Sequence, residues 1–265
     1  MSQADRSTAV WKTQHDFQYS ELNQFLFLYW DWIHPNTQET FRGRDVLDAG
    51  SGPGVQIRMM AEVARSVTAV DLEALDTSRE KTSDLSGRIR YVRGDISKME
   101  LGRTFDVINC VGVIHHTDDP TLTFWNLFRH LKPGGRMIIW AYAEEGNWLM
   151  KHLVEPFRKA VLDQAPHGVI WTLSLFLTLL IWPVVHSLYR LPFRRLPYYD
   201  YFSNFRRMSF RRNALNVYDK LNAPQQHFLP RATINAWFSP EKFEDIHISH
   251  YKGVSWRASG TRVGF

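Results

Sequence analysis

The sequence predicts an α/β domain built on a mostly parallel β-sheet, with a large helical insertion before its last helix and two strands. Strand-like and helix-like segments alternate from Arg44 to Tyr142, which is typical of βαβ units whose sheet is covered on both faces. A glycine-rich turn, GSGPG, follows the first of these strands and opens a helix. The alternation stops for about ninety residues after Tyr142 and then resumes. One interrupted α/β domain is therefore expected.

The composition is that of an ordinary globular chain. Its 265 residues are 44% apolar and 22% charged, which excludes a disordered, a collagenous or a disulfide-stapled protein. The single cysteine, Cys110, cannot form an intramolecular disulfide, so a reducing cytoplasm is the expected location. The first residues have no apolar core behind a basic start, and no signal peptide is expected.

Four parts of the chain are expected. Residues 1–39 form a helical, aromatic-rich lead-in, 40–142 the core, 143–230 a helical insertion or cap, and 231–265 the segment that completes the core. The core strands are expected in RDVLDAG, SVTAVDL, IRYVRGDI, FDVINCV and RMIIWAY, and its helices in VQIRMMAEVA, 74–85 and LTFWNLFRHL, the last stopped by KPGG. A helix in TINAWFSPEKF and strands in EDIHISHY and VSWRASGTRV follow the insertion.

The glycine turn marks a ligand site. Glycines let backbone N–H groups approach a ligand closely at the start of a helix. The dinucleotide fingerprint requires a third glycine three residues after the second, where this chain has Val55, and this disfavours a nicotinamide oxidoreductase. Asp71 ends the next strand, seventeen residues after Gly54, as needed to hold a ribose diol, and Asp95 ends the third strand.

These segments resemble the class I S-adenosylmethionine-dependent methyltransferases. The resemblance is carried by DVLDAGSGPG, VTAVDL, VRGDI, FDVINCVGVIHHTDDP and LKPGGRMIIW, in that order over about 100 residues. It implies a Rossmann-like sheet of seven strands with one reversed strand, and S-adenosylmethionine as cofactor with S-adenosylhomocysteine as product. The implied binding residues are Asp48, Gly50, Ser51, Gly52, Pro53 and Gly54 for the amino-acid end, Asp71 with Leu72 for the ribose, Asp95 and Ile96 for the adenine, and Cys110 and Val111, in the run to Val113, beneath the sulfonium.

His115 and His116 are the candidate catalytic residues. They follow the fourth strand, at the edge where an open α/β sheet places its active site, and an imidazole titrates near neutrality. Methyl transfer to an oxygen requires in-line displacement and removal of a proton. Many relatives in the resembled family carry a Glu-His or His-His pair here; His115 replaces the Glu that metal-assisted relatives need, so no metal is expected. A structural role for either ring stays open. Weaker candidates outside the core are His15, Tyr19, Tyr218, His227 and Arg257.

The insertion combines an apolar stretch with a basic one. Gly168–Tyr189 has no formal charge, contains fifteen apolar residues, and is long enough to span a bilayer. Arg190–Arg212 contains seven arginines and one acid, Asp200, so this segment carries +6 and the remaining chain −1. A single span is excluded because strands of one sheet precede and follow it, and Pro183 also interrupts the stretch. An internal cap over the site and an interfacial helix that contacts an anionic membrane through 168–212 both stay open.

The sequence therefore predicts an enzyme that transfers a methyl group from S-adenosylmethionine to an oxygen, or with less support a nitrogen or carbon. Its acceptor is expected to be a small molecule, a glycan or a lipid-linked compound. The protein is expected in the cytoplasm, and any association with a membrane is expected to be peripheral. Two alternatives stay open. A nucleic-acid methyltransferase is disfavoured because the fourth strand ends in VGVIHH and lacks an N/DPPY-type loop. A subunit without catalysis would bind the cofactor but turn over no acceptor.

Overall fold

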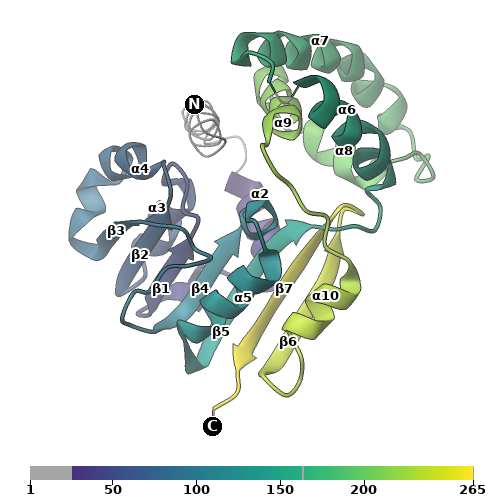
Figure 1. The fold of residues 1–265 in the computed structure, drawn as a ribbon. Helices are drawn as coiled ribbons and strands as arrows, with labels where there is room; N and C mark the ends of the chain where they lie inside the picture. The colour runs from purple at the N-terminus through teal and green to yellow at the C-terminus, as the bar shows by residue number, and fades with distance from the viewer. Residues whose placement is uncertain (1–25, 163, 265) are drawn as a thin grey trace.

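A seven-stranded sheet forms the centre of the computed structural model, which describes residues 26–162 and 164–264 (Figure 1). The strand order is β3-β2-β1-β4-β5-β7-β6, and β7 alone of these strands runs against the others. The strands are β1 Asp45–Ala49, β2 Ser66–Asp71, β3 Ile89–Arg93, β4 Phe105–Val111, β5 Leu131–Tyr142, β6 Phe243–Tyr251 and β7 Ser255–Arg262. The predicted mostly parallel sheet with one reversed strand is confirmed.

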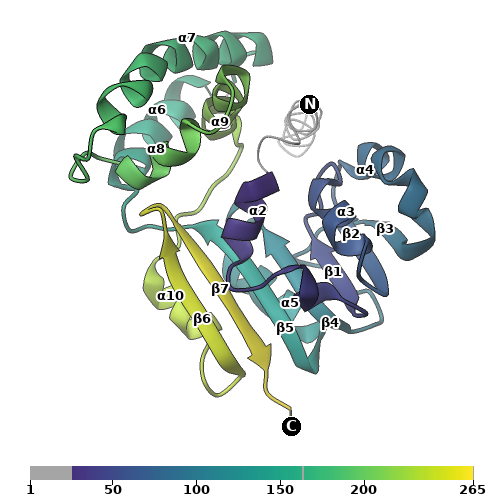
Figure 2. The same cartoon turned by 180° about the vertical axis from the view of Figure 1, so that it is seen from behind.

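Helices cover both faces of the sheet (Figures 1 and 2). On one face, Phe124 of α5 stacks on Trp237 of α10, with ring centroids 4.8 Å apart. On the other face, α2 and α3 bury Tyr29 and Ile57 against β1, β2 and β4. The helices of the core are α2 Leu26–Ile33, α3 Val55–Ala61, α4 Leu75–Lys81, α5 Pro120–Arg129 and α10 Arg231–Trp237, with 3₁₀ turns at Gln38–Phe41, Ser83–Arg88 and Ile114–His116.

Local sequence signals explain these elements. β4 is almost completely buried, as expected of a central parallel strand with helices on both faces, and its sequence FDVINCV is accordingly a nearly continuous apolar run. α5 begins at Pro120, where a missing N–H costs nothing, and the Asp119 carboxylate accepts the N–H groups of Thr121 (2.8 Å) and Leu122 (2.9 Å).

Several predicted boundaries differ from the structure. α5 ends at Arg129, before the predicted helix end at KPGG, and β5 begins at Leu131. The pairing with β4 jumps from Phe105 opposite Leu131 to Val107 opposite Arg136, so KPGG forms a bulge inside the strand. α10 ends at Trp237 and α4 at Lys81, both earlier than predicted. Pro183 lies in the last turns of α7 without ending that helix. Most of the predicted lead-in lies outside the described residues.

The chain leaves the sheet after β5 and forms a helical cap, which we define as residues 144–222. Its elements are two π-helical turns, Met150–Val154 and Arg158–Leu162, that flank α6 Glu155–Phe157, then α7 His167–His186, the 3₁₀ turn Leu188–Arg190, α8 Tyr199–Phe205 and α9 Phe210–Asn222. α7 packs on α9 through Ile170, Leu215 and Tyr218. Figures 1 and 2 both place the cap beyond the edge of the sheet at which the parallel strands end.

Residues 223–230, the return segment, join the cap to the core. The N–H of His227 donates to the carbonyl oxygen of His115 (2.7 Å), and that of Leu229 donates to the carbonyl oxygen of Tyr142 (2.9 Å). On the cap side, the Gln226 amide donates to the Glu155 carboxylate (2.8 Å). The cap is thus attached to the ends of β4 and β5 by backbone hydrogen bonds.

Candidate active site

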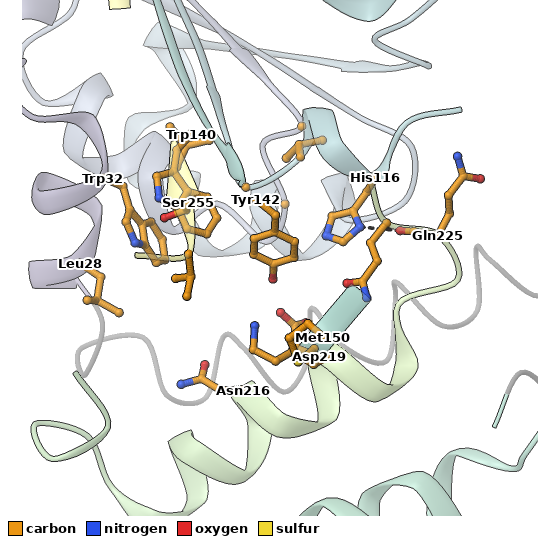
Figure 3. Close-up of a pocket in the computed structure, with 18 of the residues that line it drawn as sticks. Leu28, Trp32, His116, Trp140, Tyr142, Met150, Asn216, Asp219, Gln225 and Ser255 are labelled. Atoms are coloured by element: carbon orange, nitrogen blue, oxygen red, sulfur yellow. Dashed lines mark hydrogen bonds between the residues drawn. The ribbon is translucent and has the colours of Figure 1, made fainter. Parts of the chain in front are cut away.

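A cavity of about 930 Å³ lies between the core and the cap (Figure 3). His116, Trp140 and Tyr142 of the core face Asn216 and Asp219 of α9 across it. Because parallel strands end at this edge, their loops converge on one space. The sequence-predicted residues that line the cavity are Gly50, Ser51, Gly52, Pro53, Asp71, Leu72, Asp95, Ile96, Val111 and His116.

Asp71 holds the glycine turn at the end of β2. One carboxylate oxygen accepts the N–H of Gly52 (2.9 Å), and the other accepts those of Glu73 (2.9 Å) and Ala74 (3.0 Å). Gly50 has φ +80°, and a Cβ there would lie 2.4 Å from Cγ1 of Val113. Only glycine fits this position, and it brings the backbone of the turn close to the end of β4.

The polar atoms around the turn fit the amino-acid end of S-adenosylmethionine. Oδ2 of Asp48 and Oγ of Ser51 are buried and have no hydrogen-bond partner among the described residues. Asn109 donates to Oδ1 of Asp48 (2.8 Å). Burial raises the pKa of Asp48 to about 7, with a contribution from the charge of Asp71, although the Asn109 hydrogen bond opposes the increase. An ammonium group bound close to the turn would favour the charged form of the Asp48 carboxylate beneath it.

The adenine-side residues are also in place. Asp95 lines the cavity next to Ile96, and its Oδ1 accepts the N–H (2.8 Å) and the hydroxyl (2.6 Å) of Ser97. These bonds fix the carboxylate at the end of β3, on the same side as Asp71. The donors and acceptors present therefore fit the cofactor that the resemblance implies.

Four predicted residues do not line the cavity: Asp48, Gly54, Cys110 and His115. Asp48 is buried under the turn, as described above. Gly54 has φ +92°, and a Cβ there would lie 2.8 Å from the Ser78 hydroxyl, so this glycine allows α3 to approach α4. Of the run from Cys110 to Val113 that is predicted to pass beneath the sulfonium, Val111, Gly112 and Val113 line the cavity. The Cys110 thiol is fully buried in the core, and burial raises its pKa above the usual range.

His116 is a neutral, oriented imidazole on the cavity wall. Its Nδ1 lies 2.6 Å from the carbonyl oxygen of Gln225 in the return segment. Since a carbonyl oxygen only accepts hydrogen bonds, Nδ1 carries the proton and Nε2 is the acceptor nitrogen. Burial lowers the pKa of His116 to about 4, and the charge of Lys220 contributes to this shift.

His115 is placed differently from His116. Its side chain is 1% exposed and its ring packs between those of His116 and Tyr142, with centroid distances of 4.2 and 4.0 Å. Neither ring nitrogen has a hydrogen-bond partner among the described residues, and burial holds its pKa well below the usual value. Of the two predicted catalytic histidines, only His116 reaches the cavity.

The sequence reasoning missed the residues that the cap and β5 contribute. Nζ of Lys220, on α9, lies 4.9 Å from the ring centroid of Tyr142 and 5.4 Å from that of Tyr201. Burial acts to lower the pKa of Lys220, but Tyr142, Tyr201 and Asp219 raise it above the usual range, so this ammonium is charged. Trp32 and Trp140 stack at 4.7 Å and form an aromatic wall. Only the alternation of Trp140 and Tyr142 at the end of β5 could have indicated part of this set.

The weaker candidate residues that the structure describes make hydrogen bonds to other residues of the fold. The Tyr218 hydroxyl pairs with Nδ1 of His167 (2.8 Å), and Arg257 donates to the Ser249 hydroxyl (3.0 Å) and the Asp31 carbonyl oxygen (2.9 Å). Nε2 of His227 lies 2.9 Å from the Gln225 side chain. His15 and Tyr19 lie outside the described residues.

The core of the chain is similar to known methyltransferases. Residues 47–139 match the family described as "Methyltransferase domain". The mitochondrial ubiquinone biosynthesis O-methyltransferase of Schizosaccharomyces pombe is 35% identical over 104 residues, which is 37% of this chain and 38% of that protein. An uncharacterized protein of Synechococcus is 34% identical over 140 residues, 48% of this chain and 34% of that protein. The chain thus spans less than half the length of these curated relatives.

A solved structure shares the fold. An O-methyltransferase family protein from Burkholderia thailandensis superposes with a TM-score of 0.57 and 12% identity, over 95% of this chain and 60% of that one. Three observations support the same assignment: the sheet order, the glycine turn held by Asp71, and the matched family. Residues 47–139 therefore form a methyltransferase domain, and the sheet around them has the fold of the class I S-adenosylmethionine-dependent methyltransferases.

Proposed function

We propose that this protein transfers a methyl group from S-adenosylmethionine to a hydroxyl oxygen of a small-molecule acceptor held between core and cap. The observation that carries the proposal is the state of His116. It is a neutral imidazole on the cavity wall, its tautomer is fixed by the Gln225 carbonyl, and it belongs to the same strand-end edge as the glycine turn and Asp71.

The residues of the cavity have the chemistry that O-methylation needs. S-adenosylmethionine supplies an electrophilic methyl group on a sulfonium sulfur. With both substrates bound, the acceptor oxygen would form the new C–O bond as the C–S bond breaks, and Nε2 of His116 would take the hydroxyl proton. The charged Lys220 stabilises negative charge on the acceptor oxygen, which makes the hydroxyl acidic enough for a weak base such as His116.

The cavity walls favour an acceptor with an aromatic or otherwise flat apolar part. Trp32 and Trp140 stack on one side, and Tyr142 stacks with Phe228 at a centroid distance of 6.2 Å. Such rings bury apolar surface with little loss of side-chain freedom. The O-methyltransferase names of the curated relatives support the same reaction class.

Label transfer from methyl-labelled S-adenosylmethionine tests the proposal. The purified chain would be incubated with lipid extracts, aqueous extracts or nucleic acid, with Gly52→Arg as a variant in which the cofactor site is blocked. The expected result is a labelled methoxy product in a small-molecule fraction. Labelled nucleic acid would contradict the proposal. So would a protein that binds S-adenosylhomocysteine yet labels nothing, which is the behaviour of a non-catalytic subunit.

A further inference from the structure

The outer face of α7 is apolar, unlike that of a helix on a water-facing surface, and two of its four buried side chains are polar. Its buried positions include Ser174 and Thr178, whose hydroxyls bond back to the carbonyl oxygens of Ile170 (2.7 Å) and Ser174 (2.6 Å). Its outer positions carry Phe176, 55% exposed, and Leu179, 61% exposed. A helix with one face in water normally carries polar residues on that face. The outer face of α7 therefore fits an apolar surrounding better than water.

This apolar face is extensive. Figures 1 and 2 both show α7 along the edge of the cap farthest from the sheet. The exposed apolar residues of α7 and of the segment after it are Val169, Phe176, Leu179, Leu180, Val184, Leu188, Leu191 and Phe193. Exposed apolar surface of this extent on a monomer is characteristic of a binding surface.

Three arginines lie at the C-terminal end of the same face. Arg190, Arg194 and Arg195 are exposed and alternate with the exposed Leu191 and Phe193. No carboxylate of the described residues forms an ion pair with them, and residues 164–199 contain no acid at all. The other arginines predicted to belong to this surface differ: Arg212 is buried, and Arg206 donates to the Tyr189 carbonyl oxygen (2.8 Å). Arg207 and Arg211 are also exposed, but Arg207 lies over the ring of Phe27, 3.7 Å from its centroid, so we define the basic part of the face as residues 190–195.

The topology excludes a membrane span. α7 is long and apolar enough to cross a bilayer, and among the described residues it is the one such helix. However, β5 precedes it and β7 follows it, and these strands pair over seven residues from Arg136 to Tyr142. Both ends of α7 therefore stay on one side of any membrane, so this helix could contact a bilayer only by lying in its interface.

We infer that the outer face of α7, with Arg190, Arg194 and Arg195, binds the surface of an anionic lipid bilayer. The apolar side chains enter the region between headgroups and acyl chains, and the arginines pair with lipid phosphates. The opposite side of α7 places Leu177 and Ile181 in the wall of the cavity. This placement implies that the acceptor is lipid-soluble and is delivered from the bilayer, an implication that rests on the proposed function.

Vesicle flotation tests the inference with a readout independent of methyl transfer. The full chain would be floated with vesicles of equal parts phosphatidylglycerol and phosphatidylcholine, and with phosphatidylcholine alone. We expect binding to the anionic vesicles, and a loss of roughly 100-fold in partition for Arg190→Gln/Arg194→Gln/Arg195→Gln. The matched control, Arg44→Gln/Arg90→Gln/Arg231→Gln, removes three exposed arginines from the core and should bind as the wild type does.

A second pair of variants separates the apolar contribution. Leu179→Gln should weaken binding about tenfold, whereas Leu122→Gln, at an exposed leucine of α5, should not. S-adenosylhomocysteine affinity shows that each variant is folded. Wild-type protein that binds this ligand but no anionic vesicle would overturn the inference, as would equal binding to neutral vesicles. If the protein formed a dimer in the absence of lipid, and Leu179→Gln dissociated that dimer, the face would bind a second copy of the chain and the inference would be wrong.

Discussion

Nδ1 of His116 donates to the carbonyl oxygen of Gln225 across a distance of 2.6 Å, and this bond joins the end of β4 to the segment that returns from the cap. The two residues are 109 positions apart in the chain. The bond selects the tautomer in which Nε2 accepts, so placement of the cap and the protonation state of His116 are coupled. The Gln225 side chain also donates to the carbonyl oxygen of Thr117 (3.0 Å), which fixes the return segment on the same loop.

Blocking the glycine turn should abolish cofactor binding. Gly52→Arg places a long cationic side chain in the cavity, next to the backbone that approaches the ligand. Calorimetry with S-adenosylhomocysteine should then detect no binding. Gly102→Arg is the matched control, since that glycine also has a positive φ but lies on the surface with open space around it. Wild-type affinity in Gly52→Arg would remove this turn from the cofactor site.

Asp71→Asn should lower affinity for S-adenosylhomocysteine by about 10- to 100-fold, because a charged acceptor for the ribose hydroxyls becomes a neutral one. Asparagine keeps an oxygen for part of the turn, whereas Asp71→Ala would leave the N–H groups of Gly52, Glu73 and Ala74 without their acceptor. Calorimetry measures the affinity and thermal unfolding the stability. Unchanged affinity would show that Asp71 only holds the turn.

Cofactor affinity should depend on pH through Asp48. Its pKa is raised to about 7, so below this pH the folded protein holds a proton that a bound ammonium group displaces. Affinity for S-adenosylhomocysteine should therefore increase between about pH 5.5 and 7, by up to about tenfold per pH unit, and then level off. For the free protein the sign is opposite. The unfolded state ionises first, so stability falls as pH rises from about 4 to 7.

Asp48→Asn provides the control for this prediction. It should bind more weakly and show no slope in affinity over the same range. An equal slope in the wild type and in Asp48→Asn would assign the titration to another group.

Lys220 should contribute to turnover and not to cofactor binding. Lys220→Met removes the ammonium that faces Tyr142 and Tyr201, and we expect about a 100-fold decrease in kcat. Lys220→Arg keeps the charge and should retain more activity. Steady-state kinetics of both variants, together with S-adenosylhomocysteine affinity, check this prediction. If the KM for the acceptor increased and kcat stayed unchanged, Lys220 would only help to bind the acceptor as part of the cavity wall.

The core could be predicted from the sequence because its signals are local. The segment FDVINCV is apolar at five of its seven positions and forms a central strand. The turn after Asp48 is glycine-rich because a Cβ at Gly50 would lie too close to the Val113 side chain. The reversed last strand also followed from segment order together with the resemblance. These features depend on short stretches of chain.

The cap side of the site could not be predicted because its residues meet only in the folded chain. Lys220 faces Tyr142 from a helix 78 positions later, and the Gln225 carbonyl reaches His116 through the return segment. No spacing in the sequence distinguishes His116 from His115, since their separation depends on the 3₁₀ turn Ile114–His116 that turns one ring toward Tyr142 and the other toward the cavity. Likewise, the arginines of 190–212 are alike in sequence but not in exposure.

The kinetics of His116→Ala test the central claim most directly. The variant removes the acceptor nitrogen from the cavity while leaving the glycine turn intact, so kcat should fall by about 100- to 10,000-fold and S-adenosylhomocysteine affinity should stay within about threefold. His115→Ala, outside the cavity, should reduce kcat less, and His247→Ala, on the exposed strand β6, should change neither quantity. Wild-type turnover in His116→Ala would contradict the account, because methyl transfer would then require no base at this position.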